Sequence, residues 1–150
     1  MPGVELPAGA AGRKRLRILV AGTSDAIDTL TRTLHHDADI VPARSVSEAL
    51  AAFGPGVDVV CCNVRFDESR MFDFLLALRQ RPDGARVRVV SARITGTELA
   101  PRMRTSIRSA LEALGVETFI DIPQLTEQYG AQVALEALRQ VLLRGEFEDL

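Results

Sequence analysis

A run of apolar residues from Val57 to Cys62, interrupted only by Asp58, ends in a polar side chain at Asn63. A strand that is buried on both faces of a parallel sheet has this pattern, whereas a half-exposed strand alternates apolar and polar residues. The run therefore predicts a central parallel strand with Asn63 at its carboxyl end. Ligands of open α/β sheets bind at that end. The Asn63 amide is a poor nucleophile and, being uncharged, attracts no hard cation.

Strand and helix patterns alternate on both sides of this strand. Short connections join them, which predicts a doubly wound, five-stranded parallel sheet of order 2-1-3-4-5 with helices on both faces. Ser45 and Glu48 have the spacing of a capping box, and Gly115 has the place of a C-cap. We expect the other strands at 16–21, 39–43, 87–91 and 118–121, and helices at 27–34, 47–53, 71–78, 99–114 and 125–143.

The apolar periodicity of the later helices predicts which side chains face the core. In the helix at 71–78 the apolar stripe leaves Leu76 exposed. In the helix at 99–114 we place Arg104 and Arg108 on the outer face. Pro123 should break the chain before the last helix, which carries Tyr129. The inward residues are then Met71, Phe74, Leu75 and Leu78; Leu99, Met103, Ile107, Ala110, Leu111 and Leu114; and Ala134, Ala137, Leu138, Val141 and Leu142.

The chain of 150 residues is long enough for one buried core and too short for two ordinary domains. We expect a single domain at 14–145, a disordered tail at 1–13 and an acidic tail at 146–150. A net charge of −2 argues against a general nucleic-acid binder. No apolar run reaches the roughly 18 residues of a membrane span, and the amino end lacks the apolar region of a signal peptide. These features predict a cytoplasmic protein.

Cysteine, histidine and lysine usage excludes several kinds of chemistry. Cys61 and Cys62 are adjacent, so on a strand they point to opposite faces and act as buried apolar residues rather than as a redox pair. His35 and His36, at a helix end, lie in no metal-ligand pattern and are expected at the surface. Of 18 basic residues only Lys14 is a lysine, in the amino-terminal tail. We attribute the arginine bias mainly to genomic base composition.

The order and spacing of several short motifs resemble the receiver domain of two-component response regulators. The likeness runs from about residue 16 to 143. It rests on residues 18–20 (ILV), 45–50 (SVSEAL), 57–63 (VDVVCCN), 91–92 (SA) and 115–116 (GV), followed by 119–123 (FIDIP). It implies a flavodoxin-like, receiver-like three-layer sandwich. In that family a phosphoryl group passes from a histidine kinase to an aspartate that ends the third strand.

The residues that hold magnesium and phosphate in that family are mostly replaced in this chain. Asn63 stands in the place of the acceptor aspartate, and Gly22 and Thr23 stand in the places of the acidic pair that holds magnesium. Ile122 replaces the lysine before Pro123, and Ser91 alone fits the family pattern. Phosphoryl transfer needs a carboxylate nucleophile and cations that offset the charge of the phosphoryl group. The resemblance therefore implies a degenerate pseudo-receiver, with no cofactor, no metal and no enzymatic activity.

Such a module would act in signalling by binding another protein: a sensor kinase, another regulator or a second copy of itself. The expected contact surface, also for a homodimer, is the fourth helix, fifth strand and fifth helix, with the loop from Val64 to Met71 as a second candidate. No helix-turn-helix pair is present, which argues against DNA binding. The individual partner candidates are Arg102, Arg104, Arg108, Phe66 and Leu76.

Two alternatives stay open. Gly22-Thr23-Ser24, before a helix, offers N–H groups and hydroxyls to the phosphate of a nucleotide or flavin, although there is no Trp and the only Tyr is Tyr129. A phospho-accepting or hydrolytic enzyme could instead use a carboxylate site rebuilt from Asp25, Asp67 and Asp121. Helix capping by Asp25 and solvated loop positions for the other two are favoured. Ser91 is interpreted as a satisfied hydroxyl, since no base is placed beside it.

Overall fold

A computed structural model of the chain describes residues 15–96 and 99–144. The tails predicted at 1–13 and 146–150 lie outside these residues, as does Lys14. None of the helices in the described ranges is long and apolar enough to span a bilayer.

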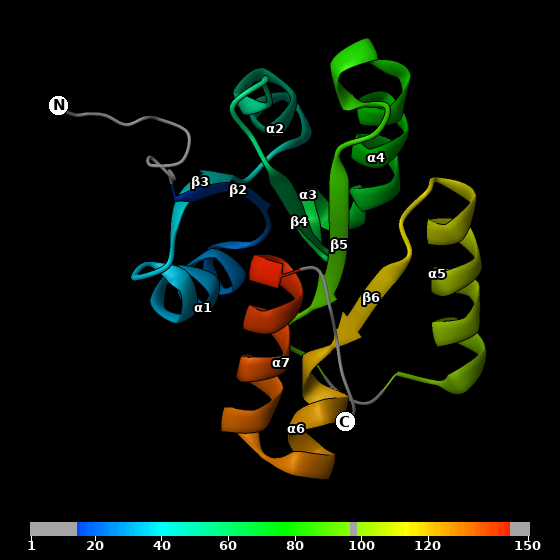
Figure 1. Cartoon of the computed structure of the whole chain (residues 1–150). Helices are drawn as coiled ribbons and strands as arrows, with labels where there is room; N and C mark the ends of the chain where they lie inside the picture. Colours follow the sequence, from blue (N-terminus) through cyan, green and yellow to red (C-terminus); the bar gives the residue numbers. More distant parts are fainter. Residues whose placement is uncertain (1–14, 97–98, 145–150) are drawn as a thin grey trace, which may run out of the picture.

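The described residues form one five-stranded parallel sheet of order β3-β2-β4-β5-β6 (Figure 1). Counted along the chain this is the order 2-1-3-4-5, so the predicted fold class is confirmed. In the register of the central strands Asn63 lies beside Ala92, and Arg93 lies beside Asp121. The strands are β2 (Leu16–Ala21), β3 (Ala38–Ala43), β4 (Val59–Asn63), β5 (Arg88–Arg93) and β6 (Thr118–Asp121).

Helices cover both faces of the sheet. The apolar side chains of α1 and α7 form one core with one face of the sheet, and those of α2, α4 and α5 form a second core with the other face (Figure 1). The helical elements are α1 (Ser24–Leu34), α2 (Val46–Ala52), α3 (Phe66–Ser69), α4 (Met71–Gln80), the 3-10 turn η1 (Pro82–Gly84), α5 (Pro101–Ala113), α6 (Ile122–Tyr129) and α7 (Ala131–Arg144).

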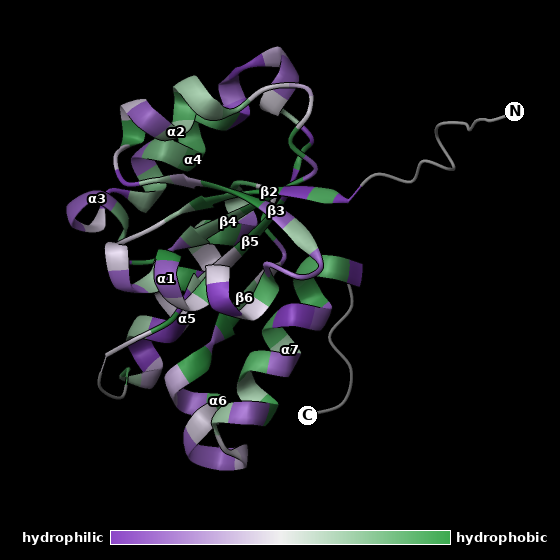
Figure 2. Cartoon of the chain, turned by 90° about the vertical axis from the view of Figure 1, so that its left-hand side faces the viewer, coloured by the Kyte–Doolittle hydropathy of each residue, from purple (hydrophilic) through white to green (hydrophobic). Residues whose placement is uncertain are grey.

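All five residues of β4 are buried, as the apolar run predicts. Cys61 belongs to the core under α1 and α7, and Cys62 belongs to the core under α2 and α4, so the two thiols do point to opposite faces. In Figure 2 the strands at the centre of the molecule are apolar, and the outer surfaces of the helices are largely polar. Asn63 is therefore carried to the carboxyl edge by the most deeply buried strand.

Several predicted helix boundaries are confirmed by their caps. Ser45 Oγ accepts the Glu48 N–H at 3.1 Å, and the Glu48 carboxylate accepts the Arg44 N–H at 2.8 Å, which is close to the predicted capping box. Gly115 follows α5 with a φ of +73°, a conformation that favours glycine. The four apolar residues predicted for α4 are buried, and Leu76 is 50% exposed.

Two predicted boundaries near the carboxyl end are wrong. The fourth strand, β5, continues through Ala92 and Arg93, beyond its predicted end at Ser91. The predicted last helix is two helices that meet at Gly130, where φ is +95°. Pro123 does not break the chain before a helix but lies in the first turn of α6, where its missing N–H leaves no intrahelical bond unmade.

Candidate functional site

The carboxyl edge of β4 presents Asn63, which is only 3% exposed. Its side-chain oxygen accepts the backbone N–H of Arg65 at 2.8 Å, so the amide is held by its own loop. A Cβ at Gly22 would lie 3.3 Å from the Asn63 Cβ and 3.2 Å from the Ala26 Cβ. Gly22 and Asn63 are thus neighbours as predicted, but a carboxylate at position 22 would require its neighbours to shift.

The other residues that align with the receiver site are committed to structural contacts. Thr23 is the N-cap of α1, and its hydroxyl accepts the Ala26 N–H at 3.3 Å. Ser91 is fully buried, and its hydroxyl donates to the Met71 sulfur at 3.3 Å, which confirms the interpretation of a satisfied hydroxyl. Ile122 is buried in the core under α1 and α7. None of these aligned residues brings a cation or a carboxylate to Asn63.

The cysteines behind Asn63 are not reactive groups. Burial raises the pKa of the Cys61 thiol to about 12, and it also raises the pKa of Cys62 well above its ordinary value. The thiolate is the nucleophilic form of cysteine, so both side chains act as apolar core residues near neutral pH.

The three carboxylates considered for a rebuilt site have separate structural roles. Asp25 lies in the first turn of α1 and is exposed; the N-cap is Thr23, so the expected capping role of Asp25 is wrong. Asp67 accepts the Val46 N–H at the start of α2 at 2.8 Å. Asp121 is buried between two arginines. Across residues 15–96 and 99–144, no group of three or more acidic, histidine or cysteine side chains is placed to hold a metal ion.

Asp121 is the centre of a charged network that sequence reasoning missed. Arg93 Nη1 binds one carboxylate oxygen at 3.0 Å and Arg104 Nη2 binds the other at 3.1 Å. The side chains are 3% exposed for Asp121, 10% for Arg93 and 18% for Arg104. Asp121 also caps α6 by accepting the Gln124 N–H at 3.3 Å. Arg93 and Asp121 are paired residues of the neighbouring strands β5 and β6. The sequence could have indicated this network only if β5 had been predicted to extend to Arg93.

A pocket of about 380 Å³ lies beside this network, at the carboxyl edge between β5, β6, α5 and α6. Neither Asn63 nor Ser91 lines it. The described residues that do are Arg93, Gly96, Leu99, Arg104, Asp121, Pro123, Gln124, Thr126, Glu127 and Gln128.

The prediction for the outer surface of α5 is partly wrong. Met103, expected inside, is 53% exposed, whereas Arg104, expected outside, reaches Asp121. Arg104 is therefore not available to a partner in this arrangement. Arg108 is exposed with its guanidinium 5.5 Å from the centre of the Phe119 ring, and Arg102 is exposed. The predicted cluster of three arginines is thus reduced to two.

The loop from Val64 to Met71 also differs from its prediction. Phe66 is fully buried and packs edge-on against Phe74, so Phe66 cannot serve as a surface contact and that candidate is wrong. Asp67, Glu68 and Ser69 all have φ between +49° and +68°, an unusual conformation for residues other than glycine. Residues of this loop that remain exposed include Arg65, Glu68 and Arg70.

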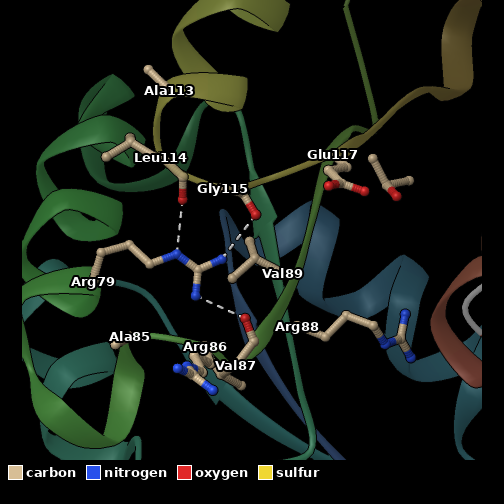
Figure 3. Close-up of a pocket in the computed structure, with 11 residues that line it drawn as sticks. Arg79, Ala85, Arg86, Val87, Arg88, Val89, Ala113, Leu114, Gly115 and Glu117 are labelled. Atoms are coloured by element: carbon tan, nitrogen blue, oxygen red, sulfur yellow. Dashed lines mark hydrogen bonds between the residues drawn. The ribbon is translucent and has the colours of Figure 1, made fainter.

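Another pocket, of about 610 Å³, lies at the opposite, amino edge of the sheet. Figure 3 shows Arg79 between backbone carbonyls, and Arg79 donates to Leu114, Gly115 and Val87. Arg88 donates to the carbonyls of Val141 and Leu142 near the end of α7. Val141 and Leu142 lie in the last turn of α7, and Leu114 is the C-cap of α5, so both arginines donate to carbonyls at helix ends. The two arginines of this pocket bind backbone carbonyls and so connect neighbouring elements. These contacts do not indicate a ligand.

Neither a protein-family model nor a curated protein matches the chain. Solved structures do match it. The chemotaxis response regulator CheY4 of Vibrio cholerae has a TM-score of 0.64 at 20% identity, over 86% of this chain and 100% of that protein. The phosphorylated cyanobacterial phytochrome response regulator RcpA has 0.66 at 16% identity, over 89% and 97%. The Mn²⁺-bound response regulator Rcp1 has 0.64 at 16% identity, over 89% and 99%. The resemblance to receiver domains is thereby confirmed at the level of the fold.

Proposed function

We propose that this chain is a pseudo-receiver: a module of receiver fold that accepts no phosphoryl group and acts in a two-component-like pathway by binding another protein. The supporting observation is that the polar side chains at the carboxyl edge of the central strands are engaged in contacts within the protein. The amide of Asn63 is held by the Arg65 N–H, and the hydroxyl of Ser91 is held by the Met71 sulfur.

Chemistry at this edge supports the same conclusion. RcpA and Rcp1 are described in phosphorylated and Mn²⁺-bound forms. Phosphoryl transfer to a side chain needs a nucleophile and cations that neutralise the transferred group. In this chain Asn63 supplies no nucleophile, Gly22 supplies no metal ligand, and the buried Ile122 supplies no cation. We infer that the fold was kept for its surfaces, because the core does not require the reactive groups.

The surface that we assign to a protein partner is the one expected from the sequence: α5 on one face of the sheet, the edge strand β6, and the last helical region, α6 and α7. Arg102 and Arg108 give it positive charge, and Met103 gives it an exposed apolar side chain. Tyr129 on α6 and Val133 on α7 are exposed apolar residues of the neighbouring helices. Aromatic, methionine and arginine side chains are enriched in protein interfaces. A sensor kinase, another regulator or a second copy of this chain fits this chemistry.

The loss of phosphotransfer is tested with acetyl phosphate and with beryllofluoride, each in the presence of Mg²⁺. We expect an unchanged intact mass after acetyl phosphate and an unchanged melting temperature in beryllofluoride. Formation of an acyl phosphate on any aspartate, or stabilisation by beryllofluoride that depends on Mg²⁺, would contradict the proposal.

The interaction surface is tested by sedimentation of the purified protein and by affinity capture followed by binding measurements with the purified partner. The double variant Arg102→Glu with Arg108→Glu should abolish self-association or partner binding. The matched control is Arg32→Glu with Arg44→Glu, which reverses two exposed charges on other elements. Equal effects of the two pairs would show that α5 is not the contact surface.

A further inference from the structure

The pocket at the amino edge of the sheet carries an excess of positive charge. Its charged lining consists of three guanidinium groups and one carboxylate, from Arg79, Arg86, Arg88 and Glu117. None of the ion pairs in the described part of the chain includes any of these three arginines. We propose that this pocket binds an acidic peptide segment, and that its occupant is the segment 145–150 of the same molecule. Such binding is independent of the function proposed above, since Asn63 and Ser91 do not line the pocket.

The contacts of Arg79 and Arg88 provide hydrogen-bond acceptors but no counter-charge. Both guanidinium groups donate to backbone carbonyls. A carbonyl has no net charge, so it satisfies a donor without neutralising a cation. Burial lowers the pKa of Arg79 and of Arg88, as expected for cations that lose water without gaining a carboxylate partner. The pocket therefore favours a negatively charged occupant.

Arg86 supplies a guanidinium group that such an occupant can reach. Its side chain is exposed and makes no hydrogen bond or ion pair with the described residues. Arginine binds carboxylates through paired N–H groups. Beside Arg86, the side chains of Val87, Val89 and Leu114 give the pocket an apolar part. The volume of about 610 Å³ is typical of sites for small ligands, so it suits a short peptide segment.

The sequence that follows α7 has the matching composition. The segment 145–150 lies outside the described residues; its sequence, GEFEDL, contains three carboxylates, a phenylalanine, a leucine and no basic residue. Negative charge just beyond the carboxyl end of a helix is unfavourable, because that end already carries partial negative charge. Contact with the arginines of the pocket removes this repulsion, and Phe147 suits the apolar part.

The structure brings the end of α7 to this pocket. Arg88 lines the pocket and also donates to the carbonyls of Val141 and Leu142 at 2.8 and 2.7 Å. In Figure 3 the Arg88 side chain extends from the pocket towards α7. An extended chain spans up to about 3.3–3.6 Å per residue, so six residues after Arg144 can reach about 20 Å. Neighbouring strands are only about 4.8 Å apart, so the space between β5 and β6 is within the reach of segment 145–150.

Amide NMR of the full chain tests whether the segment is bound. A neutral variant keeps the length of the segment and replaces its three carboxylates by Glu146→Gln, Glu148→Gln and Asp149→Asn. The amide signals of Arg86, Gly115 and Glu117 should differ between the wild type and this variant, while those of Asn63 and Gly96 at the opposite edge stay in place. Raising sodium chloride from about 0.05 to about 0.5 M should move the wild-type signals towards those of the neutral variant, since salt screens exposed charges.

A synthetic peptide of residues 145–150 measures the affinity of the pocket. Added to the neutral variant, it should shift the same amides in a saturable way. Its affinity for the wild type should be about threefold lower, because the tethered segment competes at an effective concentration in the millimolar range. Arg86→Gln in the neutral variant should weaken peptide binding about threefold, the size of one exposed ion pair. Arg17→Gln, the same change at an exposed arginine of the same sheet edge, should leave the affinity unchanged.

Three results would overturn the proposal. Unchanged signals of Arg86, Gly115 and Glu117 in the neutral variant would show that the segment does not occupy the pocket. Equal losses of peptide affinity in Arg86→Gln and Arg17→Gln would show attraction by the whole sheet edge instead of this pocket. Wild-type signals that move on dilution would identify the segment of a second copy as the occupant. All of these measurements leave the intact mass unchanged, so they and the acetyl phosphate result can fail separately.

Discussion

Replacing Asp121 by asparagine removes the one carboxylate that Arg93 and Arg104 share. The asparagine oxygen can still cap α6, but its NH₂ group faces an arginine donor in place of the second carboxylate oxygen. Because the Asp121 side chain is only 3% exposed, water cannot take the place of the carboxylate beside the two guanidinium groups. Removing one partner of a buried ion pair lowers the free energy of unfolding by about 3–5 kcal/mol. Because asparagine retains the cap of α6, we expect Asp121→Asn to cost about 3 kcal/mol, at the lower end of this range.

The matched control is Asp83→Asn, because Asp83 makes two contacts of similar length with Arg81. Both of those distances are 3.1 Å, but the two side chains are 36% and 40% exposed. Exposed ion pairs contribute about 0–1 kcal/mol. The two substitutions therefore remove the same kind of contact and differ mainly in burial.

The measurement is urea unfolding followed by circular dichroism, with thermal melts alongside. For a chain of this length about 3 kcal/mol corresponds to a fall in melting temperature of about 9 °C for Asp121→Asn, against about 2 °C for Asp83→Asn. The buffer contains chloride and no phosphate, because an oxyanion bound by the freed arginines would mask the loss. A cost below about 1 kcal/mol for Asp121→Asn, or equal costs for both variants, would refute the argument from burial.

Four other outcomes follow from the described contacts and burial. Arg88→Met should lower the free energy of unfolding by about 2 kcal/mol, because two carbonyls near the end of α7 lose their charged donor. Arg86 is exposed and lines the same pocket, so Arg86→Met should cost much less, and thermal melts compare the two variants. Cys61 and Cys62 should resist iodoacetamide in the folded protein and react in urea. The pKa of Cys61 in the folded protein, about 12, lies above the ordinary value of 9.0. The stability that is present below pH 9 should therefore be lost as the pH rises from about 9 towards 12. Urea titrations at several pH values measure this loss. Asn63→Asp should still not be phosphorylated by acetyl phosphate, because a single carboxylate recreates neither the metal ligands nor the cation; an increase in intact mass would contradict this.

Much of the fold could be predicted because its determinants are local in the chain. The apolar run that ends at Asn63 identified a strand buried on both faces, and the capping residues Ser45 and Glu48 identified the start of a helix. Alternation of strands and helices then predicted the sheet order, since parallel strands need crossover connections. The last helix was predicted wrongly because apolar periodicity does not show that the backbone at Gly130 has a φ of +95°, which ends α6, or that Pro123 lies in the first turn of α6.

The candidate site was less predictable from the sequence. The motif order placed Gly22 and Asn63 together, and the lack of a neighbouring base favoured a satisfied hydroxyl at Ser91. Neither could show that the acceptor of that hydroxyl bond is the Met71 sulfur. Hydrophobic periodicity favours burying Met103 and exposing Arg104. Asp121 reverses this preference, because a buried carboxylate attracts the nearest guanidinium.

The sequence by itself therefore determined most of the elements, their order in the sheet and the absence of a carboxylate at the end of β4, because each depends on neighbouring residues or on one position. Only the tertiary structure decided the roles of the arginines. Arg79 and Arg88 close the ends of helices, and Arg93 and Arg104 share Asp121. Composition alone could not assign these roles, because a charge takes its function from partners that are distant in the chain and meet it only when the sheet and helices are packed.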